Sequence, residues 1–414
     1  MIQRQSKRQE PISLAVINPN PLLDPAWRNF VDDMIPTFVK EVYSPKAKWA
    51  TKPFGEVDAR FFSTGIRELS DHFTELRPSR GMISYFDHPK YRSSYLLYFL
   101  PLQAAKFLTL FTLHPGAMAA MFAHAEKSNG VLRVADLGAG PGTASLALLF
   151  FLLQGKDKAK GLSAISKIEL NWFDVNLPIL SDGHKLIERM VAKNPALKNK
   201  IDLRTYSIPW WKALDKIEDQ SIVLLGNVLN EGNPLSPKSD PFWQNLFSVA
   251  KGAGTLFVEP AAKKSSQLLS HLRDHFFEAE MIESDPSQIW GPCLHTQKCP
   301  LSSGRDWCHF SVPVEIPGKW FKFFSQCLGS ERQWLKFSYL WISGGVSREI
   351  SEGISAGKQN RSNPFTHLRR VISDPIPIPG RGGQRSILLC EPERPGRLAI
   401  PAHKKINRGD LVKI

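Results

Sequence analysis

Cysteine, long apolar runs and acidic residues are all scarce in this sequence of 414 residues. Five cysteines are too few for a disulfide framework in so long a chain, and they indicate a reducing compartment, with metal binding or reactivity as their use. The most apolar long window, residues 95–113, is interrupted by Pro101 and Lys106 and falls short of the roughly 20 residues that span a bilayer, so we expect a buried helix and no membrane contact. No apolar segment follows the basic residues 1–10, so a secretory signal is not expected.

The shortage of acidic residues leaves a net charge of +14, from 53 Lys and Arg against 39 Asp and Glu. Residues 358–414 hold twelve Lys and Arg against four acids, so +8 of the excess lies in the last 57 residues. A basic segment of this kind predicts a polyanionic partner, nucleic acid before a membrane surface. The alternative is a solvated surface that only keeps the protein in solution.

The pattern of apolar residues divides the chain into three regions. Helical spacing over residues 25–113, with a kink expected at Pro36, predicts an N-terminal helical region. Short apolar runs then alternate with helix-length segments, which predicts crossover units and a doubly wound parallel sheet. The predicted strands are residues 132–136, 168–174, 201–206, 222–226 and 255–259. The expected fold class is α/β, with a helical region at 1–115, a Rossmann-like domain at 116–288 and a cysteine-containing, basic, β-rich extension at 289–414.

A glycine-rich loop follows the first predicted strand, with the sequence DLGAGPGT at residues 136–143. Glycines let the backbone approach a ligand closely. The spacing resembles motif I of S-adenosylmethionine-dependent methyltransferases more than a pyrophosphate-binding fingerprint, which implies a loop around the methionine part of that ligand. The candidate ligand-binding residues are Asp136, Gly138, Ala139, Gly140 and Gly142, together with Asp174, which ends the second strand and is expected to accept the ribose hydroxyls. The alternatives are a tight turn that binds nothing and, for Asp174, a helix cap.

No catalytic residue emerges from the sequence. The N-P-P-aromatic signature of amino-group methylation at bases is absent after the fourth strand, where Asn227 and Glu231 could line a pocket or simply cap the loop. Cys293 is rejected as a nucleophile for pyrimidine methylation because it follows the fifth strand and belongs to a cysteine cluster.

Three cysteines within sixteen residues, Cys293, Cys299 and Cys308, predict a metal site in a Gly/Pro-rich segment. Their spacing leaves zinc and an iron–sulfur cluster open, and His295 or His309 could complete tetrahedral zinc. For Cys390 the alternative is an ordinary buried cysteine in an apolar strand. Cys327 is isolated and is left out of the site.

Several strings together carry a family resemblance: the glycine loop, Glu259-Pro260, C-x-H-x3-C-P-L from Cys293, D-W-C-H-F at 306–310 and F-S-Y at 337–339. From about Tyr85 to Cys390 the chain resembles the methyltransferase-like proteins of the small ribosomal subunit, which have mitochondrial and bacterial-type members. The resemblance implies an S-adenosylmethionine methyltransferase fold and association with small-subunit rRNA. It also implies a 4Fe-4S cluster on four ligands: Cys293, Cys299, Cys308 and Cys390.

The function expected is therefore that of a ribosome-associated, methyltransferase-like protein in small-subunit assembly or translation, which binds rRNA and acts as a monomer in the bacterial cytoplasm. A mitochondrial matrix location is the alternative. S-adenosylmethionine is the expected cofactor, and methylation of the rRNA is an activity that the sequence leaves open. Two other functions stay open: a non-catalytic iron–sulfur assembly factor that binds RNA, and a methyltransferase for a small molecule or protein with structural zinc.

Overall fold

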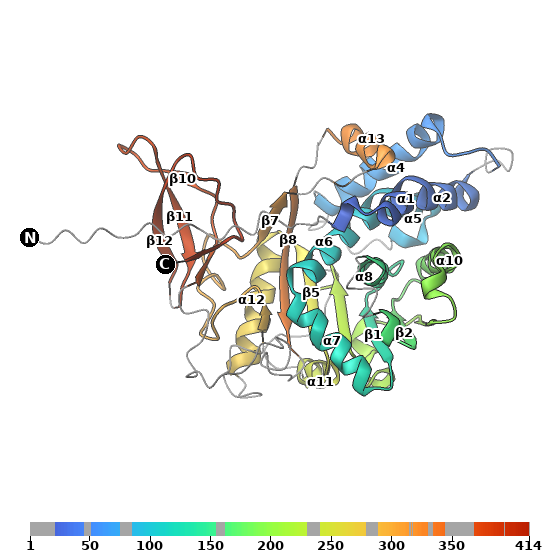
Figure 1. Ribbon diagram of the computed structural model, residues 1–414. Coiled ribbons are helices and arrows are strands. Elements are labelled where there is room, and N and C mark those ends of the chain that lie inside the picture. The colour runs from blue at the N-terminus through green and yellow to red at the C-terminus, as the bar shows by residue number, and fades with distance from the viewer. Residues whose placement is uncertain are drawn as a thin grey trace, which may run out of the picture.

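The computed structural model describes residues 21–44, 51–74, 85–154, 162–229, 241–278, 289–313, 316, 318–329, 334–343, 368–392 and 394–413. Its centre is a mostly parallel sheet in the order β3-β2-β1-β4-β5-β8-β6, with β7 paired to β8 (Figure 1). The strands are β1 (Val131–Leu137), β2 (Lys167–Phe173), β3 (Ile201–Tyr206), β4 (Ile222–Gly226), β5 (Thr255–Pro260), β6 (Ile289–Gly291), β7 (Phe310–Pro313) and β8 (Trp334–Ile342). All five predicted strands are confirmed within one or two residues.

The sheet is covered on both faces, as a doubly wound fold requires. Successive residues of β1 point to opposite faces, so that Val134 joins one buried cluster and Ala135 the other. The first cluster holds side chains of α6 (Leu100–Leu113), α7 (Pro115–Lys127), α8 (Thr143–Leu153) and α10 (Leu177–Lys193). The second holds side chains of α11 (Pro241–Val249) and α12 (Lys263–Glu278). The chain thus has a mixed α/β, Rossmann-like fold.

The N-terminal helices gather at one end of the molecule with α13 (Lys319–Cys327) (Figure 1). They are α1 (Pro25–Asn29), α2 (Ile35–Tyr43), α4 (Glu56–Thr74) and α5 (Pro89–Ser94). Near Pro36, where a kink was expected, the helix is irregular: a π-helical turn, η2 (Phe30–Met34), precedes α2, and Pro36 lies in the first turn of α2. Val57 and Phe61 in α4 are part of the helical spacing of apolar residues over 25–113, yet their side chains are 69% and 50% exposed.

The helix Pro89–Leu113 is long and apolar enough to cross a membrane, yet 83% of its most apolar window is buried inside the protein. It consists of α5, a π-helical turn η4 (Tyr95–Phe99) and α6. Its position in the core agrees with the buried helix expected for residues 95–113.

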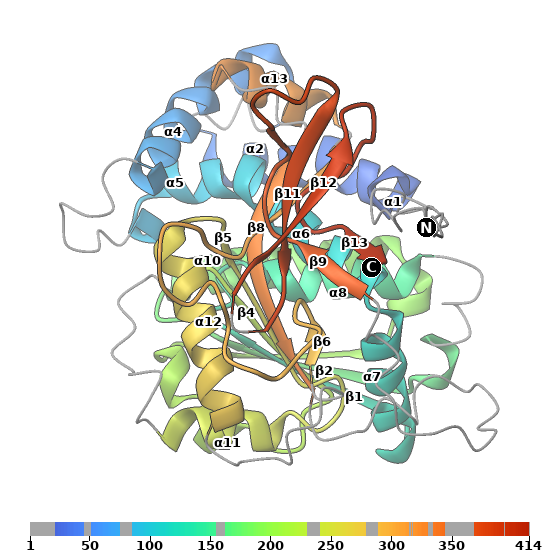
Figure 2. The same cartoon turned by 90° about the vertical axis from the view of Figure 1, so that its left-hand side faces the viewer.

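A second, smaller sheet near the C-terminus has the order β10-β11-β9-β13, with β12 paired to β11 (Figure 2). Its strands are β9 (Leu368–Val371), β10 (Ile376–Pro377), β11 (Gln384–Cys390), β12 (Gly396–Pro401) and β13 (Leu411–Lys413). The β-rich tail is therefore confirmed. The segment before it contributes β6, β7 and β8 to the central sheet, where β8 runs antiparallel to β5, a pairing that the sequence pattern did not indicate. The division of the chain at 115/116 and 288/289 stays a prediction.

Candidate functional site

The glycine loop lies at the carboxyl end of β1, between β2 and β4, where the order of strands reverses. In doubly wound sheets this switch point is where ligands bind. Gly138, Gly140 and Gly142 have φ of 72°, 53° and 73°, in the left-handed region that favours glycine. A Cβ on Gly142 would stand 2.0 Å from the buried Trp172, whereas one on Gly140 would meet only Phe86, at 3.8 Å. Of the three glycines, Gly138 and Gly142 are packed too closely for a side chain. Only Gly140 has room for one, next to the ring of Phe86.

The backbone N–H groups of this loop are already used inside the protein. Those of Gly138 and Ala139 donate to the carbonyl of Phe173 at 2.7 and 3.0 Å, and that of Gly142 donates to the carbonyl of Ala139 at 2.8 Å. The amide of Gly140 donates to Oδ2 of Asp174 at 2.9 Å. A phosphate-binding loop directs free amides at its ligand, and this loop does not.

The two acidic candidates of the loop region have different surroundings. Asp136 is 2% exposed and accepts from both the backbone and the hydroxyl of Ser145, at 3.0 and 2.7 Å. Burial raises the pKa of Asp136 to about 6, while the Ser145 bonds lower it. Asp174 is half-buried and accepts from the amides of Gly140 and Asn176, both at 2.9 Å, and burial raises its pKa too. Asp136 thus fastens the start of α8, and Asp174 fastens the glycine loop.

Two polar atoms near the loop are buried without a hydrogen-bond partner: Oγ1 of Thr143 and Oδ1 of Asn227. Asn227 follows β4, has φ of 61°, and is held by its amide on the carbonyl of Val258 at 2.8 Å. Unsatisfied buried polar atoms are rare in native proteins and call for an explanation. Glu231, the other candidate lining residue after β4, lies outside the described residues.

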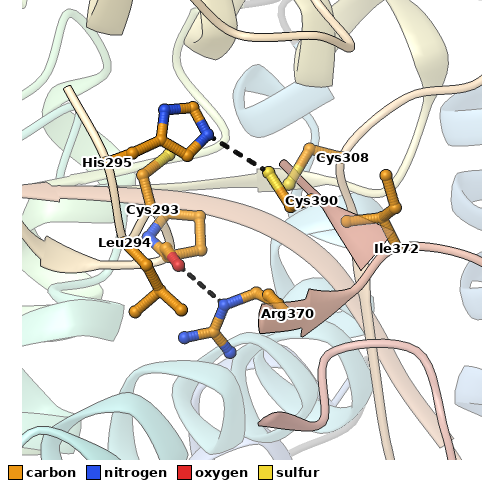
Figure 3. A pocket seen from close by; sticks show the side chains of 8 residues that line it. Cys293, Leu294, His295, Cys308, Arg370, Ile372 and Cys390 are labelled. Carbon is orange, nitrogen blue, oxygen red and sulfur yellow. Dashed lines mark hydrogen bonds between the residues drawn. The ribbon is translucent and has the colours of Figure 1, made fainter. Parts of the chain in front are cut away.

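The cysteines from two distant parts of the chain come together. Cys293, Cys308 and Cys390 line one small pocket with His295 and Arg370 (Figure 3), and Cys299 packs in a buried cluster with Cys308 and Cys390. Cys390 reaches this place on β11, which pairs with β9, so that Cys390 lies opposite Arg370. Cys327 lies in α13 with the N-terminal helices, apart from this group.

Burial is the main cause that raises the pKa of Cys299, Cys308 and Cys390, and the charge of Cys293 adds to each of the three shifts. These three thiols therefore hold their protons unless a cation replaces them. Among the residues that the structure describes, no group of three or more His, Cys, Asp and Glu side chains is arranged to hold a metal ion. The structure thus brings the thiols together and leaves their role as ligands untested.

Of the two candidate histidines, only His295 belongs to this pocket. Its Nε2 lies 3.5 Å from Sγ of Cys390, and burial followed by the charge of Arg273 lowers its pKa to about 4. His309 instead stacks on Trp307 and places Nδ1 3.2 Å from the Trp307 carbonyl. His295 is therefore neutral, and His309 is engaged elsewhere.

Two buried arginines beside the thiols were not anticipated from the sequence. Arg273, 1% exposed on α12, pairs with Asp274, whose Oδ1 also accepts the amide of Cys299 at 2.9 Å. Arg370, 8% exposed, donates to the carbonyls of Pro292 and Gly409 at 2.6 and 2.8 Å, and no carboxylate pairs with it within the described part of the chain. For Arg273 a signal existed, because it lies four residues after the buried Leu269 on the apolar side of its helix.

Some of the cations in the basic C-terminal tail are buried and do not face solvent. Arg370 and Arg408 are buried, at 8% and 9% exposure, and Arg408 donates to the Trp307 carbonyl at 3.3 Å. Among the side chains that the structure describes, the exposed cations of the small sheet and its turns are Arg381, Arg385, Arg394, Arg397 and Lys405. This sheet stands apart from the N-terminal helices on the side of the molecule that bears α12 (Figures 1 and 2).

Comparison with known proteins gives one family and two structural likenesses. A candidate RNA methyltransferase from Pyrococcus horikoshii is 11% identical with a TM-score of 0.29, over 68% of this chain and 99% of that one. The mitomycin 7-O-methyltransferase MmcR is 12% identical with a TM-score of 0.26, over 56% and 68%. At such scores the description of the fold rests on the strand order above.

The search of curated proteins finds no match. The family model of the mitochondrial small ribosomal subunit protein Rsm22 matches residues 152–407, which is more than half of the chain and includes all four candidate cysteines. This match confirms the family resemblance drawn from the motifs. The chain belongs to the mitochondrial small ribosomal subunit Rsm22 family.

Proposed function

We propose that this protein binds S-adenosylmethionine at the glycine loop and associates with small-subunit rRNA through its C-terminal sheet. The observation that carries the first part is that every N–H of the loop is satisfied internally while the Asp174 carboxylate stands beside it. Such a site repels phosphates and favours a ligand that is cationic and rich in donors. The sulfonium, the ammonium and the ribose hydroxyls of S-adenosylmethionine meet both conditions.

The unpartnered oxygens of Thr143 and Asn227 support the same ligand. Both can accept a hydrogen bond, and a bound donor would remove the cost of leaving them unsatisfied, about 1–3 kcal/mol each. When bound, the ligand supplies a methyl group on a positively charged sulfur. The residues of this chain would then hold the ligand and exclude water, and no residue is assigned as an acid or base.

A test of this ligand is isothermal titration of S-adenosylmethionine into the full-length protein, with NAD as the control. We expect S-adenosylmethionine to bind and NAD, which carries a pyrophosphate, not to bind. Tighter binding of NAD would contradict the argument from the loop amides. Methyl transfer itself is tested by incubation with labelled S-adenosylmethionine and small-subunit RNA, followed by digestion to identify the modified nucleotide.

We propose further that Cys293, Cys299, Cys308 and Cys390 hold a 4Fe-4S cluster. Four thiolates around such a cluster carry a net negative charge, and the buried Arg273 and Arg370 beside the thiols would balance it. The cluster would tie β11 of the small sheet to the segment after β6. Iron and sulfide analysis of anaerobically purified protein tests this, and a colourless protein with stoichiometric zinc would favour the zinc alternative with His295.

For RNA, the support comes from the family and from the exposed arginines of the small sheet. Arginine forms bidentate bonds with phosphates, so we expect the affinity for small-subunit rRNA to fall steeply with salt. A weak dependence on salt would argue for a small-molecule or protein substrate. The family's description favours the mitochondrial matrix over the bacterial cytoplasm, and we propose that the protein acts as a monomer in either place.

One observation favours a second candidate, a non-catalytic assembly factor. The hydrogen bonds that satisfy the glycine loop from within would also stabilise a loop that binds nothing. Titration separates the two functions: a protein that binds rRNA and shows no heat with S-adenosylmethionine is a scaffold and not an enzyme.

A further inference from the structure

A short segment of the N-terminal helical region lies directly on the glycine loop. This segment is the 3-10 turn η3 (Tyr85–Asp87), which precedes α5. Ring atoms Cε2 and Cζ of Phe86 are 3.8 Å from the position that a Cβ on Gly140 would take. The ring is half-buried and packs edge-on against Tyr95, with 5.1 Å between centroids. Phe86 thus borders the only motif glycine whose missing side chain leaves room.

Arg92 binds the backbone of the turn η3. Arg92 donates from Nη1 to the carbonyls of Phe86 and Asp87, at 2.7 and 3.3 Å. Its Nε lies 3.1 Å from the hydroxyl of Tyr43 and 3.2 Å from Asp182 on α10. Since α10 begins just after Asp174, the turn is tied to the same helix that follows the candidate ribose-binding carboxylate.

A second carboxylate is thereby placed beside the first. Asn176 donates from Nδ2 to Oδ1 of Asp87 at 2.7 Å, and its backbone amide donates to Oδ1 of Asp174 at 2.9 Å. One buried asparagine therefore joins the two acids. Asp87 is exposed, and its other oxygen has no hydrogen bond within the described part of the chain. This arrangement adds negative charge on the side of the loop that Phe86 covers.

We infer that η3 forms one wall of the ligand site, where Phe86 packs against the bound S-adenosylmethionine beside Gly140 and Asp87 attracts its donors and positive charge. The N-terminal helical region then belongs to the ligand site and is not merely packed against the sheet. The inference rests on the proposed ligand and adds two binding residues to it. It also strengthens the proposed preference against phosphates, because two carboxylates border the loop instead of one.

The test measures binding of S-adenosylmethionine to the full-length protein by calorimetry, with far-UV circular dichroism to confirm folding. Phe86→Ala should weaken binding about tenfold, because an aromatic wall is lost, and Phe86→Tyr should restore most of it. Asp87→Asn keeps the oxygen that Asn176 bonds and removes the charge, so we expect about fivefold weaker binding, which high salt should diminish. Phe61→Ala, at an exposed phenylalanine on α4, is the matched control and should bind like the wild type.

Each outcome decides one question. If the wild type binds and both Phe86→Ala and Asp87→Asn bind equally well, η3 is not part of the site and the inference is wrong. If the wild type does not bind, the proposed ligand itself is wrong. If Phe86→Ala does not fold, the isosteric Asp87→Asn, at an exposed position, still decides the matter.

Discussion

The three glycines of the loop differ in what surrounds them, and this predicts a large difference between two substitutions of the same kind. Gly142→Ala would force an alanine into the left-handed region, at a cost of about 1–2 kcal/mol. Its Cβ would also stand 2.0 Å from the ring of Trp172, which is fully buried and donates to Ser145 at 2.8 Å. Displacing that ring costs about 1–3 kcal/mol more, so we expect Gly142→Ala to lower the free energy of unfolding by about 2–5 kcal/mol.

Gly140→Ala should bear the backbone cost alone, about 1–2 kcal/mol, since its Cβ would meet Phe86 at an ordinary 3.8 Å. Gly382→Ala is the control, because it has no neighbour within 4 Å and no left-handed φ, and should change stability by less than about 0.5 kcal/mol. Urea unfolding followed by circular dichroism measures all three. If Gly142→Ala and Gly140→Ala agreed within about 0.5 kcal/mol, the steric argument for the loop would be refuted.

Three further predictions concern charge and the thiols. Because burial raises the folded pKa of Asp136 from 3.8 to about 6, ionisation of Asp136 makes the fold less stable by up to about 3 kcal/mol as pH rises from about 4 to 6. Asp136→Asn should remove this contribution, so that stability measured by urea unfolding declines less with pH than in the wild type. An equal decline in the two proteins would contradict the prediction. Arg370→Gln should lower the free energy of unfolding by about 2 kcal/mol, because it leaves the carbonyls of Pro292 and Gly409 unpaired. The exposed Arg385→Gln should leave thermal unfolding unchanged. It should reduce the salt dependence of RNA binding by about one phosphate contact. Cys299→Ser should lose both bound metal and stability, whereas the control Cys327→Ser, in α13, should keep both. Metal content is measured on anaerobically purified protein. Equal metal content in the two variants would mean that the cluster of thiols does not bind the metal.

The local pattern of the sequence was enough for the parallel strands. The central strands β4 and β5 are buried on both faces and therefore read as continuous apolar runs, as in residues 222–226. The outer strand β3 is only half-buried, and its apolar residues alternate with polar ones. The same reasoning was less successful in α4, where Val57 and Phe61 fit a helical stripe and yet face solvent. Helical periodicity predicts a buried face only if a neighbouring element covers it, and periodicity does not say how far that element extends.

For the thiols, too, the sequence predicted some features and only the structure showed others. The short spacing of Cys293, Cys299 and Cys308 was a local signal, and the family resemblance supplied Cys390. The meeting of these residues depends on the pairing of β11 with β9, which places Cys390 opposite Arg370. It depends also on the bond from Arg370 to the carbonyl of Pro292, which is 78 residues earlier in the chain. Of the two arginines beside the thiols, only Arg273 had a signal in helical spacing; Arg370 had none, because a buried cation in a strand is identified by what surrounds it.

The sequence by itself determined the elements of the central sheet, the position of the glycine loop and the basic character of the tail, since these follow from periodicity, backbone freedom and composition. The tertiary structure alone decided that the loop amides bond within the protein, that Phe86 and Asp87 lie beside Gly140, and that Arg370 is buried. The physical reason is that burial and hydrogen bonding at these places are set by segments remote in the sequence, and their contacts leave no periodic trace along the chain.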